Sequence, residues 1–401
     1  MNAAILGFYY GLWGTLAYAA YYLSFLSGAK IIDSLRFRHG YNSVQQFLFS
    51  RFGGYGTACY NFVIGVRLIS EVFANLLVIG ILFGSAGSLG YTLTIIAFAA
   101  ITLLYSVMGG LHTSLRTDFF QMLVFLVTLV LLLGLTLLSP EFKFSDLAFK
   151  PFVATDPGPI LLMVALLQVW SYPMHDPVMM DRGFIADRET TRKSFWHAAW
   201  ISLLCIISFG SLGIFAGAHA LGGEAMNTVL MRLLGEMPML LFSAALVISA
   251  MSTLDSSLSS SAKLVVVDMR MVDSTLANGR WSMAAFMLLG VAFVFYGNQD
   301  LFSAVAVSGT ASMYLTPVIF FSLWGGRQDI PVWSYLASFS VAILGALLYF
   351  TESSGYSMML GDTHKYTKLL WISITVLCTG FLSFWIGSKT SSTNIALHTP
   401  A

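Results

Sequence analysis

Apolar stretches of about 20 residues recur along the whole 401-residue chain. A stretch of this length, wound into a helix, crosses the hydrocarbon core of a bilayer. Only 10% of the residues are charged and 57% are hydrophobic, whereas ordinary soluble domains carry about 25% charged residues. The chain is therefore predicted to be an all-α polytopic membrane protein.

We expect about eleven transmembrane helices, with edges uncertain by a few residues. The predicted spans are about 5–29, 55–84, 88–108, 117–138, 159–176, 195–219, 237–262, 281–297, 300–324, 331–350 and 368–388. The longest connections, about 139–158 and 351–367, leave no room for a soluble domain. We therefore predict one transmembrane domain over residues 1–401, closed by a short polar tail at 389–401.

The distribution of positive charge predicts the orientation. Most of the 20 Lys and Arg residues lie in the loops that follow odd-numbered spans. Because cytoplasmic loops are enriched in Lys and Arg, that side is predicted to be cytoplasmic. The N-terminus is then outside and the C-terminus inside the cell (inner) membrane. The lipid bilayer is the expected environment, and no basic run points to a nucleic-acid partner.

A polar stripe interrupts the otherwise apolar span 237–262. Small hydroxyl side chains recur at helical spacing along one face, at Ser249, Ser252, Thr253, Ser256 and Ser260. A carboxylate, Asp255, borders that face. One interpretation is close helix packing, which small residues permit in lipid. The other is binding of a dehydrated cation that drives movement of a solute. We favour the cation, because a polar stripe in the bilayer is costly unless it binds something.

A second acid, Asp118, opens the predicted span 117–138. It either complements the helix dipole or pairs with Arg116, or it shares a cation site with Asp255. Sodium is a hard ion that prefers oxygen ligands. The predicted sodium site comprises Ser249, Ser252, Thr253, Asp118, Asp255 and Ser256. Two carboxylates at one site raise one pKa unless a cation lies between them, so Asp255 either tightens sodium binding or introduces proton coupling.

Two prolines, Pro173 and Pro177, break the end of span 159–176. Broken helices in membranes line cavities, typically at a binding site near the midplane. On this interpretation Trp170, Tyr172 and His175 contact a solute. The alternative is that the prolines end the span and that Trp170 and Tyr172 are interfacial anchors.

Several segments taken together resemble the sodium/solute symporter family, which includes sodium-coupled sugar, proline and sialic acid carriers. The segments are Tyr105-Ser-Val-Met-Gly-Gly-Leu with Thr117-Asp118 and Gln121, Ser252-Thr253 followed by Asp268, Asn42–Leu48 running into Arg51-Phe52-Gly53, and Asp181-Arg182 with Asp187. The resemblance covers nearly the whole chain and is carried by the combination of these segments.

The resemblance implies a leucine-transporter-like fold of two inverted five-helix repeats, with core helices over about 5–324 and accessory helices over about 331–388. Ser252 and Thr253 would give side-chain oxygens to the main sodium site, and Ser249 its backbone carbonyl. Asp118, Ser252 and Ser256 would match a second sodium site, with Asp255 at a position usually occupied by serine. The chain begins at core helix two, so the fold is expected to be N-terminally incomplete.

The function that these features predict is a sodium-coupled secondary active transporter, a symporter importing a small organic solute by alternating access. Sodium is the expected coupling ion, and the solute is a sugar, an amino acid or an organic acid. The chain is not expected to be an enzyme. One alternative is a truncated, non-transporting homologue acting as a membrane sensor or scaffold. A remote one is an intramembrane aspartyl protease, although neither aspartate has glycine-flanked surroundings.

Overall fold

The computed structural model describes residues 1–296 and 301–397, with the backbone alone for residues 109–117, 301–304 and 391–397. Regular structure in the described residues is helical throughout. In chain order the elements are α1 (Asn2–Tyr22), α2 (Ser24–Ile32), η1 (Asp33–Arg38), α3 (Val44–Phe83), α4 (Leu89–Leu138), η2 (Phe144–Leu147), α5 (Pro157–Gln168), α6 (Tyr172–His175), α7 (Pro177–Gly183), α8 (Arg188–Ala218), α9 (Met226–Leu234), α10 (Glu236–Lys263), η3 (Leu264–Asp268), α11 (Leu276–Tyr296), α12 (Leu301–Ser312), α13 (Leu315–Pro317), η4 (Val318–Trp324), α14 (Val332–Ser353) and α15 (Lys365–Leu397).

Eight helical segments in the described residues are long and apolar enough to cross a membrane. A ninth span forms if the bent pair α12 and α13–η4, which meet at 43°, is counted as one. The two remaining predicted spans, 5–29 and 159–176, coincide with the broken helices α1–α2 and α5–α6. The prediction of an all-α polytopic membrane protein is confirmed.

Helix boundaries differ from the prediction in several places. α3 begins at Val44 and α8 at Arg188, ahead of the predicted spans 55–84 and 195–219. Residues 109–117, expected to be a loop between two spans, remain helical, so α4 contains both Leu89–Met108 and Asp118–Leu138. At the other end, α15 extends to Leu397, so the predicted tail from residue 389 begins as helix.

Specific residues cause the helix breaks. α5 ends at Gln168, five residues before Pro173, and Pro177 then opens α7 as its first residue. Proline lacks the N–H that continues the helical ladder, and it fits the first turn. In α1 the break is at Gly11, whose φ of 62° interrupts the helical backbone. With a ψ of −145° as well, this conformation is adopted almost only by glycine and costs a residue with a Cβ about 1–3 kcal/mol.

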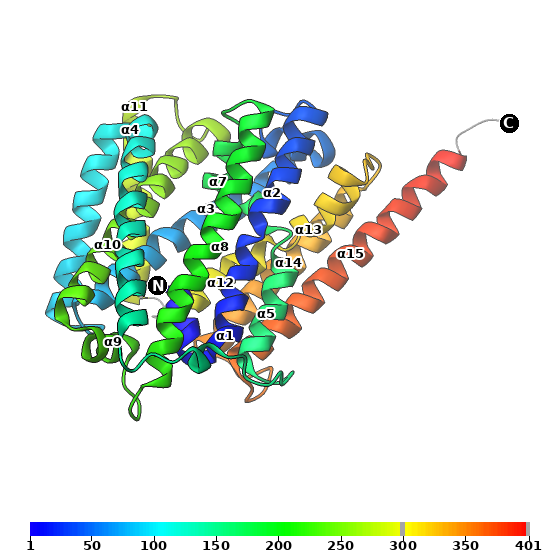
Figure 1. Cartoon of the computed structure of the whole chain (residues 1–401). Helices are drawn as coiled ribbons and strands as arrows, with labels where there is room; N and C mark the ends of the chain where they lie inside the picture. The colour runs from blue at the N-terminus through cyan, green and yellow to red at the C-terminus, as the bar shows by residue number, and fades with distance from the viewer. Residues whose placement is uncertain (297–300, 398–401) are drawn as a thin grey trace. The chain divides into compact units, whose positions relative to one another are not determined.

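The chain divides into two compact units. Unit 1 contains Met1–Ala20, Leu68–Leu162 and Ile201–Val305, and unit 2 contains Tyr21–Arg67, Met163–Trp200 and Ala306–Ala401. In unit 1, buried apolar side chains from α3, α4, α10 and α11 form one cluster, centred on residues such as Leu76, Ile95 and Leu254. Figure 1 shows α4, α10 and α11 as neighbours within this unit.

Glycines bring α1 and α8 into backbone contact in unit 1. A Cβ added at Gly7 would lie 2.4 Å from the Gly210 carbonyl oxygen, and a Cβ at Gly217 would lie 2.4 Å from the Phe8 oxygen. At Gly213 the added Cβ would overlap sterically with the Ala4 carbonyl oxygen. Small residues at such spacing are typical of transmembrane helix pairs, because lipid offers no hydrophobic drive for association. Backbone packing therefore holds α1 against α8.

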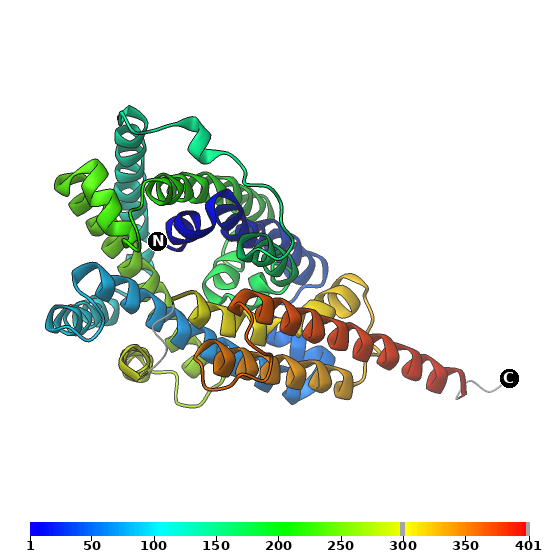
Figure 2. The ribbon, with the colours of Figure 1, turned by 90° about the horizontal axis from the view of Figure 1, so that it is seen from below.

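In unit 2, α14 and α15 run side by side, drawn orange and red in Figure 2. Near the loop that joins them, Lys368 Nζ lies 2.7 Å from Glu352 Oε2, and both side chains are almost fully buried. The other carboxylate oxygen of Glu352 accepts hydrogen bonds from the Ser357 hydroxyl and the Met359 N–H. Since buried charges are costly unless paired and hydrogen-bonded, this network fixes the geometry of the connection.

Candidate functional site

Two of the predicted sodium-site residues are in direct contact. The Ser252 hydroxyl of α10 donates a hydrogen bond to Oδ1 of Asp118 on α4. Asp118 opens the candidate span Asp118–Leu138, and both residues belong to unit 1. The structure thus brings together a carboxylate and a hydroxyl that are 134 positions apart in sequence.

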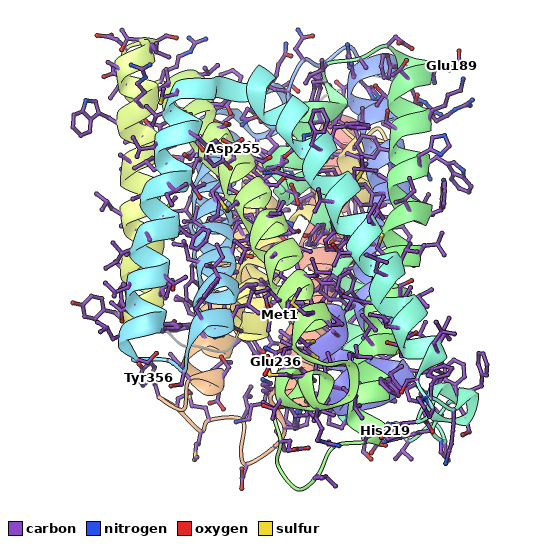
Figure 3. The ribbon with its side chains drawn as sticks, turned by 60° about the vertical axis from the view of Figure 1, so that its left-hand side comes forward. Met1, Glu189, His219, Glu236, Asp255 and Tyr356 are labelled. Atoms are coloured by element: carbon purple, nitrogen blue, oxygen red, sulfur yellow. The ribbon has the colours of Figure 1, made fainter. Side chains whose placement is uncertain are left out.

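The remaining predicted residues lie along α10. Asp255 and Ser256 are buried, at 3% and 7% exposure, and Figure 3 places Asp255 well along the helix from its first residue, Glu236. Thr253 donates its hydroxyl to the Ser249 carbonyl oxygen at 3.1 Å. This side-chain bond adds to the helical N–H bond that the same carbonyl accepts within α10.

Further polar groups that were not assigned to the site lie on the same two helices. The Tyr105 hydroxyl of α4 donates to the Met251 carbonyl of α10 at 2.9 Å. Gln121, one helical turn beyond Asp118, has a buried Oε1 with no hydrogen-bond partner among the described residues. The Ser257 hydroxyl is likewise buried and has no partner in the described part of the chain. Tyr105 and Gln121 both belong to the segments on which the family resemblance rests, and this resemblance was the one feature of the sequence that could have assigned them to the site.

These groups define the chemistry that the site can perform. The polar atoms described above on α4 and α10 are carboxylate, hydroxyl, carboxamide and carbonyl oxygens, the ligand types that a hard cation prefers. The described residues contain no cluster of three or more His, Cys, Asp and Glu residues suited to a metal ion. A set of mainly neutral oxygens with one or two carboxylates is chemically able to hold an alkali cation.

The three predicted solute contacts lie in unit 2, but they do not form one group. Tyr172 and His175 are neighbours, with ring centroids 5.0 Å apart. The His175 ring is buried, and its Nδ1 lies 2.9 Å from the Tyr172 carbonyl oxygen. Trp170 instead packs edge-on against Phe320 and Trp324 of η4, at 5.5 and 6.5 Å between ring centroids. Trp170 is therefore part of an aromatic contact with η4.

A buried arginine, which the prediction did not assign to the solute site, adjoins Tyr172. Arg67 of α3 is 5% exposed, and its Nη2 donates to the Tyr172 hydroxyl at 3.3 Å. The same nitrogen lies 3.6 Å from Asp176 Oδ2. An arginine inside a membrane protein needs such partners, and it is commonly found at a functional site.

Hydrogen bonds connect the two broken helices within unit 2. Gln168, at the end of α5, accepts from the Tyr21 hydroxyl at 2.9 Å and donates to the Thr310 hydroxyl of α12 at 3.4 Å. The Ser171 and Ser312 hydroxyls lie 3.4 Å apart. These contacts link the chain just before Tyr172 to the last turn of α12.

No protein-family model matches the chain, and no curated protein matches it in sequence. Solved structures do match. One is the substrate-bound, outward-open state of a Na+-coupled sialic acid symporter, with a TM-score of 0.67 and 14% identity over 96% of this chain and 89% of that one. Another is Mhp1, a nucleobase-cation-symport-1 family transporter in a closed conformation with bromovinylhydantoin bound. It has a TM-score of 0.58 and 14% identity over 97% of this chain and 89% of that one.

These likenesses confirm the predicted fold. The chain is a multi-pass membrane protein with the leucine-transporter-like fold shared by these cation-coupled symporters.

Proposed function

We propose that this protein is a sodium-coupled symporter that imports a small organic solute by alternating access. The observation that carries the proposal is the contact between Ser252 and Asp118, with Asp255 and Ser256 buried on the same helix. Asp255 is buried and Asp118 is half-buried, and carboxylates within a membrane-spanning bundle commonly mark an ion site. A sodium ion between them would compensate both negative charges.

The ligands proposed for sodium are those predicted from the sequence. Asp118, Ser252 and Ser256 would hold one ion, and the Ser252 and Thr253 hydroxyls with the Ser249 carbonyl would contribute to the other. The buried Oε1 of Gln121, which has no hydrogen-bond partner among the described residues, is a further oxygen in the same part of α4. Asp255 would add a second negative charge close to these oxygens.

The solute site is proposed around Tyr172 and His175, at the broken helix. The Arg67 guanidinium beside the Tyr172 hydroxyl would favour a solute that carries an anionic or strongly polar group. Trp170 is retained as a solute contact in this proposal, since its side chain is 40% exposed despite packing against η4. A sugar, an amino acid or an organic acid meets these requirements.

Coupling would follow from differential binding. An ion that binds only one conformation shifts the conformational equilibrium by its affinity difference. Inward sodium movement also gains about 2.3 kcal/mol per charge for each 100 mV of membrane potential. The proposed orientation, with the N-terminus outside and the C-terminus in the cytoplasm, follows from the distribution of Lys and Arg.

The test uses the purified full chain in proteoliposomes. Solutes are first screened by the rise in melting temperature that they cause in sodium chloride but not in choline chloride. The best solute should then accumulate only with an inward sodium gradient. The double variant Ser252→Ala with Thr253→Ala should need a higher sodium concentration for uptake, whereas Ser145→Ala, which removes an exposed hydroxyl of η2, should behave as wild type. Equal accumulation in choline would refute sodium coupling, and sodium binding without any uptake would favour a sensor.

A further inference from the structure

A cavity of about 380 Å³ lies in unit 1, lined by residues of α4, α10, η3 and α11. Its apolar wall includes Met108, Val266 and Met283, and its polar wall includes Ser106, Lys263 and Arg280. These residues are distinct from those proposed above for sodium and solute. The cavity is thus a second candidate site, with a cationic side and an apolar side.

The ends of two candidate spans meet at this cavity. The span Glu236–Asp268 ends just beyond Val267, and the span Leu276–Tyr296 begins at Leu276. Span ends lie at the boundary between hydrocarbon and headgroups. Trp281, 74% exposed, is the kind of side chain that anchors a helix at this level. The cavity therefore lies at the depth of lipid headgroups.

Two polar groups on the cavity wall have no partner among the described residues. The Ser106 hydroxyl belongs to a side chain that is only 1% exposed, and it makes no hydrogen bond there. Arg280 forms no hydrogen bond or ion pair in the described part of the chain. A buried hydroxyl without a partner is destabilising, so a ligand that accepts a hydrogen bond from it would be stabilising.

Lys263, the other cation on the cavity wall, is paired with an acid. Its Nζ lies 3.4 Å from Asp268 Oδ2, and the two charges neutralise each other.

The N-terminus of α11 also faces the cavity, since Thr275 and Leu276 line it. The positive end of a helix dipole favours an anion at such a place.

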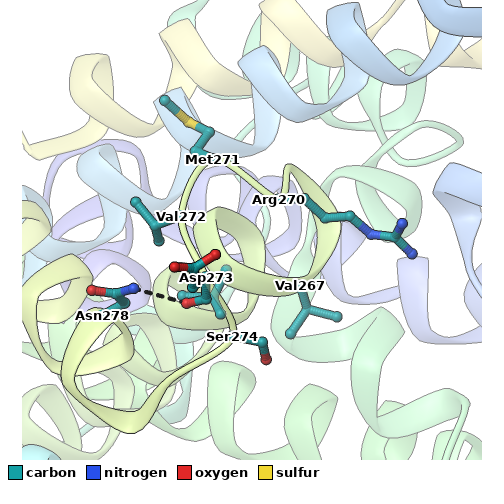
Figure 4. Close-up of a pocket in the computed structure, with 8 residues that line it drawn as sticks. Val267, Arg270, Met271, Val272, Asp273, Ser274 and Asn278 are labelled. Atoms are coloured by element: carbon teal, nitrogen blue, oxygen red, sulfur yellow. Dashed lines mark hydrogen bonds between the residues drawn. The ribbon is translucent and has the colours of Figure 1, made fainter.

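An adjacent cavity of about 760 Å³ shares Val266 and Val267 with the first. Figure 4 shows it, with Arg270 directed away from Asp273. Arg270 has a φ of 50°, in the left-handed region that residues with a Cβ avoid. Asn278 holds the turn by donating to the Asp273 carbonyl at 2.8 Å. The turn thus places one more cation, Arg270, on the wall of this cavity, which also includes the acid Asp273.

We propose that these two adjoining cavities bind an anionic phospholipid. Its phosphodiester receives hydrogen bonds from Arg280 and the Ser106 hydroxyl, with Arg270 adding positive charge. One acyl chain lies over Met108, Leu276 and Met283. Basic pockets between transmembrane helices at headgroup level bind anionic lipids in this way. A zwitterionic lipid has an ammonium group that Arg280 and Arg270 repel.

The test measures lipid retention by the purified full chain. Protein in mild detergent is stripped of lipid and then titrated with phosphatidylglycerol, phosphatidylcholine or inorganic phosphate. Retained lipid is counted by native mass spectrometry, and stabilisation is followed by the melting temperature. We expect retention of phosphatidylglycerol alone, lowered about fivefold by Arg280→Gln, the effect of one basic residue near an anionic headgroup. Ser106→Ala should weaken retention to a smaller extent.

Arg192→Gln, which changes an exposed arginine of α8 in unit 2, is the matched control and should retain lipid as wild type does. Each lipid-free variant must melt at the wild-type temperature before titration, which separates lost binding from lost folding. Equal retention of phosphatidylcholine, or equal loss in Arg280→Gln and Arg192→Gln, would overturn the proposal. Equal stabilisation by inorganic phosphate would assign the site to a free anion instead.

Discussion

The Ser252 hydroxyl donates a hydrogen bond to the Asp118 carboxylate and so joins α10 to α4 across 134 positions of sequence. The Tyr105 hydroxyl makes a second link between the same helices at the Met251 carbonyl. A hydrogen bond to an ionised group is about twice as strong as a neutral one. This pair of contacts fixes how α4 and α10 align, and it places the charge where the proposed ion would bind.

Asp118→Asn should weaken sodium binding about tenfold or more, because a hydrogen bond to a charged group contributes about 1.5–3 kcal/mol and the formal charge is also lost. The amide keeps the size of the carboxylate and can still accept from Ser252. Sodium-dependent stabilisation of the purified protein measures the effect. Asp156→Asn, an exposed loop carboxylate in the same unit, should leave sodium affinity unchanged, and an equal effect of both variants would contradict the assignment.

Asp255→Asn distinguishes the two roles proposed for the second acid. If Asp255 only adds negative charge near the ion, the variant binds sodium more weakly, and the affinity keeps the same dependence on pH. If Asp255 exchanges a proton, wild-type affinity falls as the pH is lowered and the variant loses that dependence. Sodium titrations from mildly acidic to mildly alkaline pH separate these outcomes. Identical titrations of variant and wild type would remove Asp255 from the site.

Tyr172→Phe should weaken solute binding by about two- to tenfold, since one neutral hydrogen bond contributes about 0.5–1.5 kcal/mol. The ring is retained, so packing against His175 is preserved. Sodium binding without solute should remain at the wild-type value, because none of the proposed sodium ligands lies on this segment. Isothermal titration with the solute and with sodium gives both affinities. A loss of sodium affinity alone would contradict the assignment.

Gly213→Ala should destabilise the protein by about 1–3 kcal/mol or more, the usual cost of overpacking. The added methyl would overlap the Ala4 carbonyl oxygen, a backbone atom that cannot rotate away. Gly134→Ala is the matched control, since nothing lies within 4 Å of a Cβ there. The melting temperature in detergent compares the two variants. Equal melting temperatures would show that α1 and α8 are not in backbone contact.

Asp33→Asn should remove an acid-sensitive part of the stability. A hydrogen bond from Arg188, which forms an ion pair with Asp33, holds the pKa of this carboxyl below its usual value, and Arg38 adds to the effect. Because the pKa is lower in the folded state, the carboxylate stabilises the fold above the unfolded value of about 3.9. This contribution declines as the pH falls below that value and is lost below the folded pKa. The variant should therefore melt lower than wild type at neutral pH, and the difference should vanish in acid. A difference that persists in acid would contradict this explanation.

The parts of the fold that the sequence predicted depend on local patterns. Uninterrupted apolar length predicted the spans, and Pro173 with Pro177 predicted a break, because proline acts on its own helix. The break at Gly11 was not predicted. Glycine within an apolar helix usually serves packing, and nothing in its neighbours indicates the φ of 62° that it adopts.

The candidate site was predictable to a similar extent. Asp118, Asp255 and the hydroxyl stripe were recognisable because polar groups are rare in apolar helices. The partners of Tyr105 and Gln168 were not, because the Met251 carbonyl and the Thr310 hydroxyl lie more than a hundred residues away. Trp170 was predicted to contact solute, but its packing on Phe320 depends on where η4 lies, which no local pattern specifies.

The links from Gln168 to Thr310 and from Ser171 to Ser312 have a mechanical consequence. Each hydrogen bond joins the break between α5 and α6 to the last turn of α12. A bound molecule that moves the segment near Tyr172 is therefore expected to move α12 directly, through these two contacts.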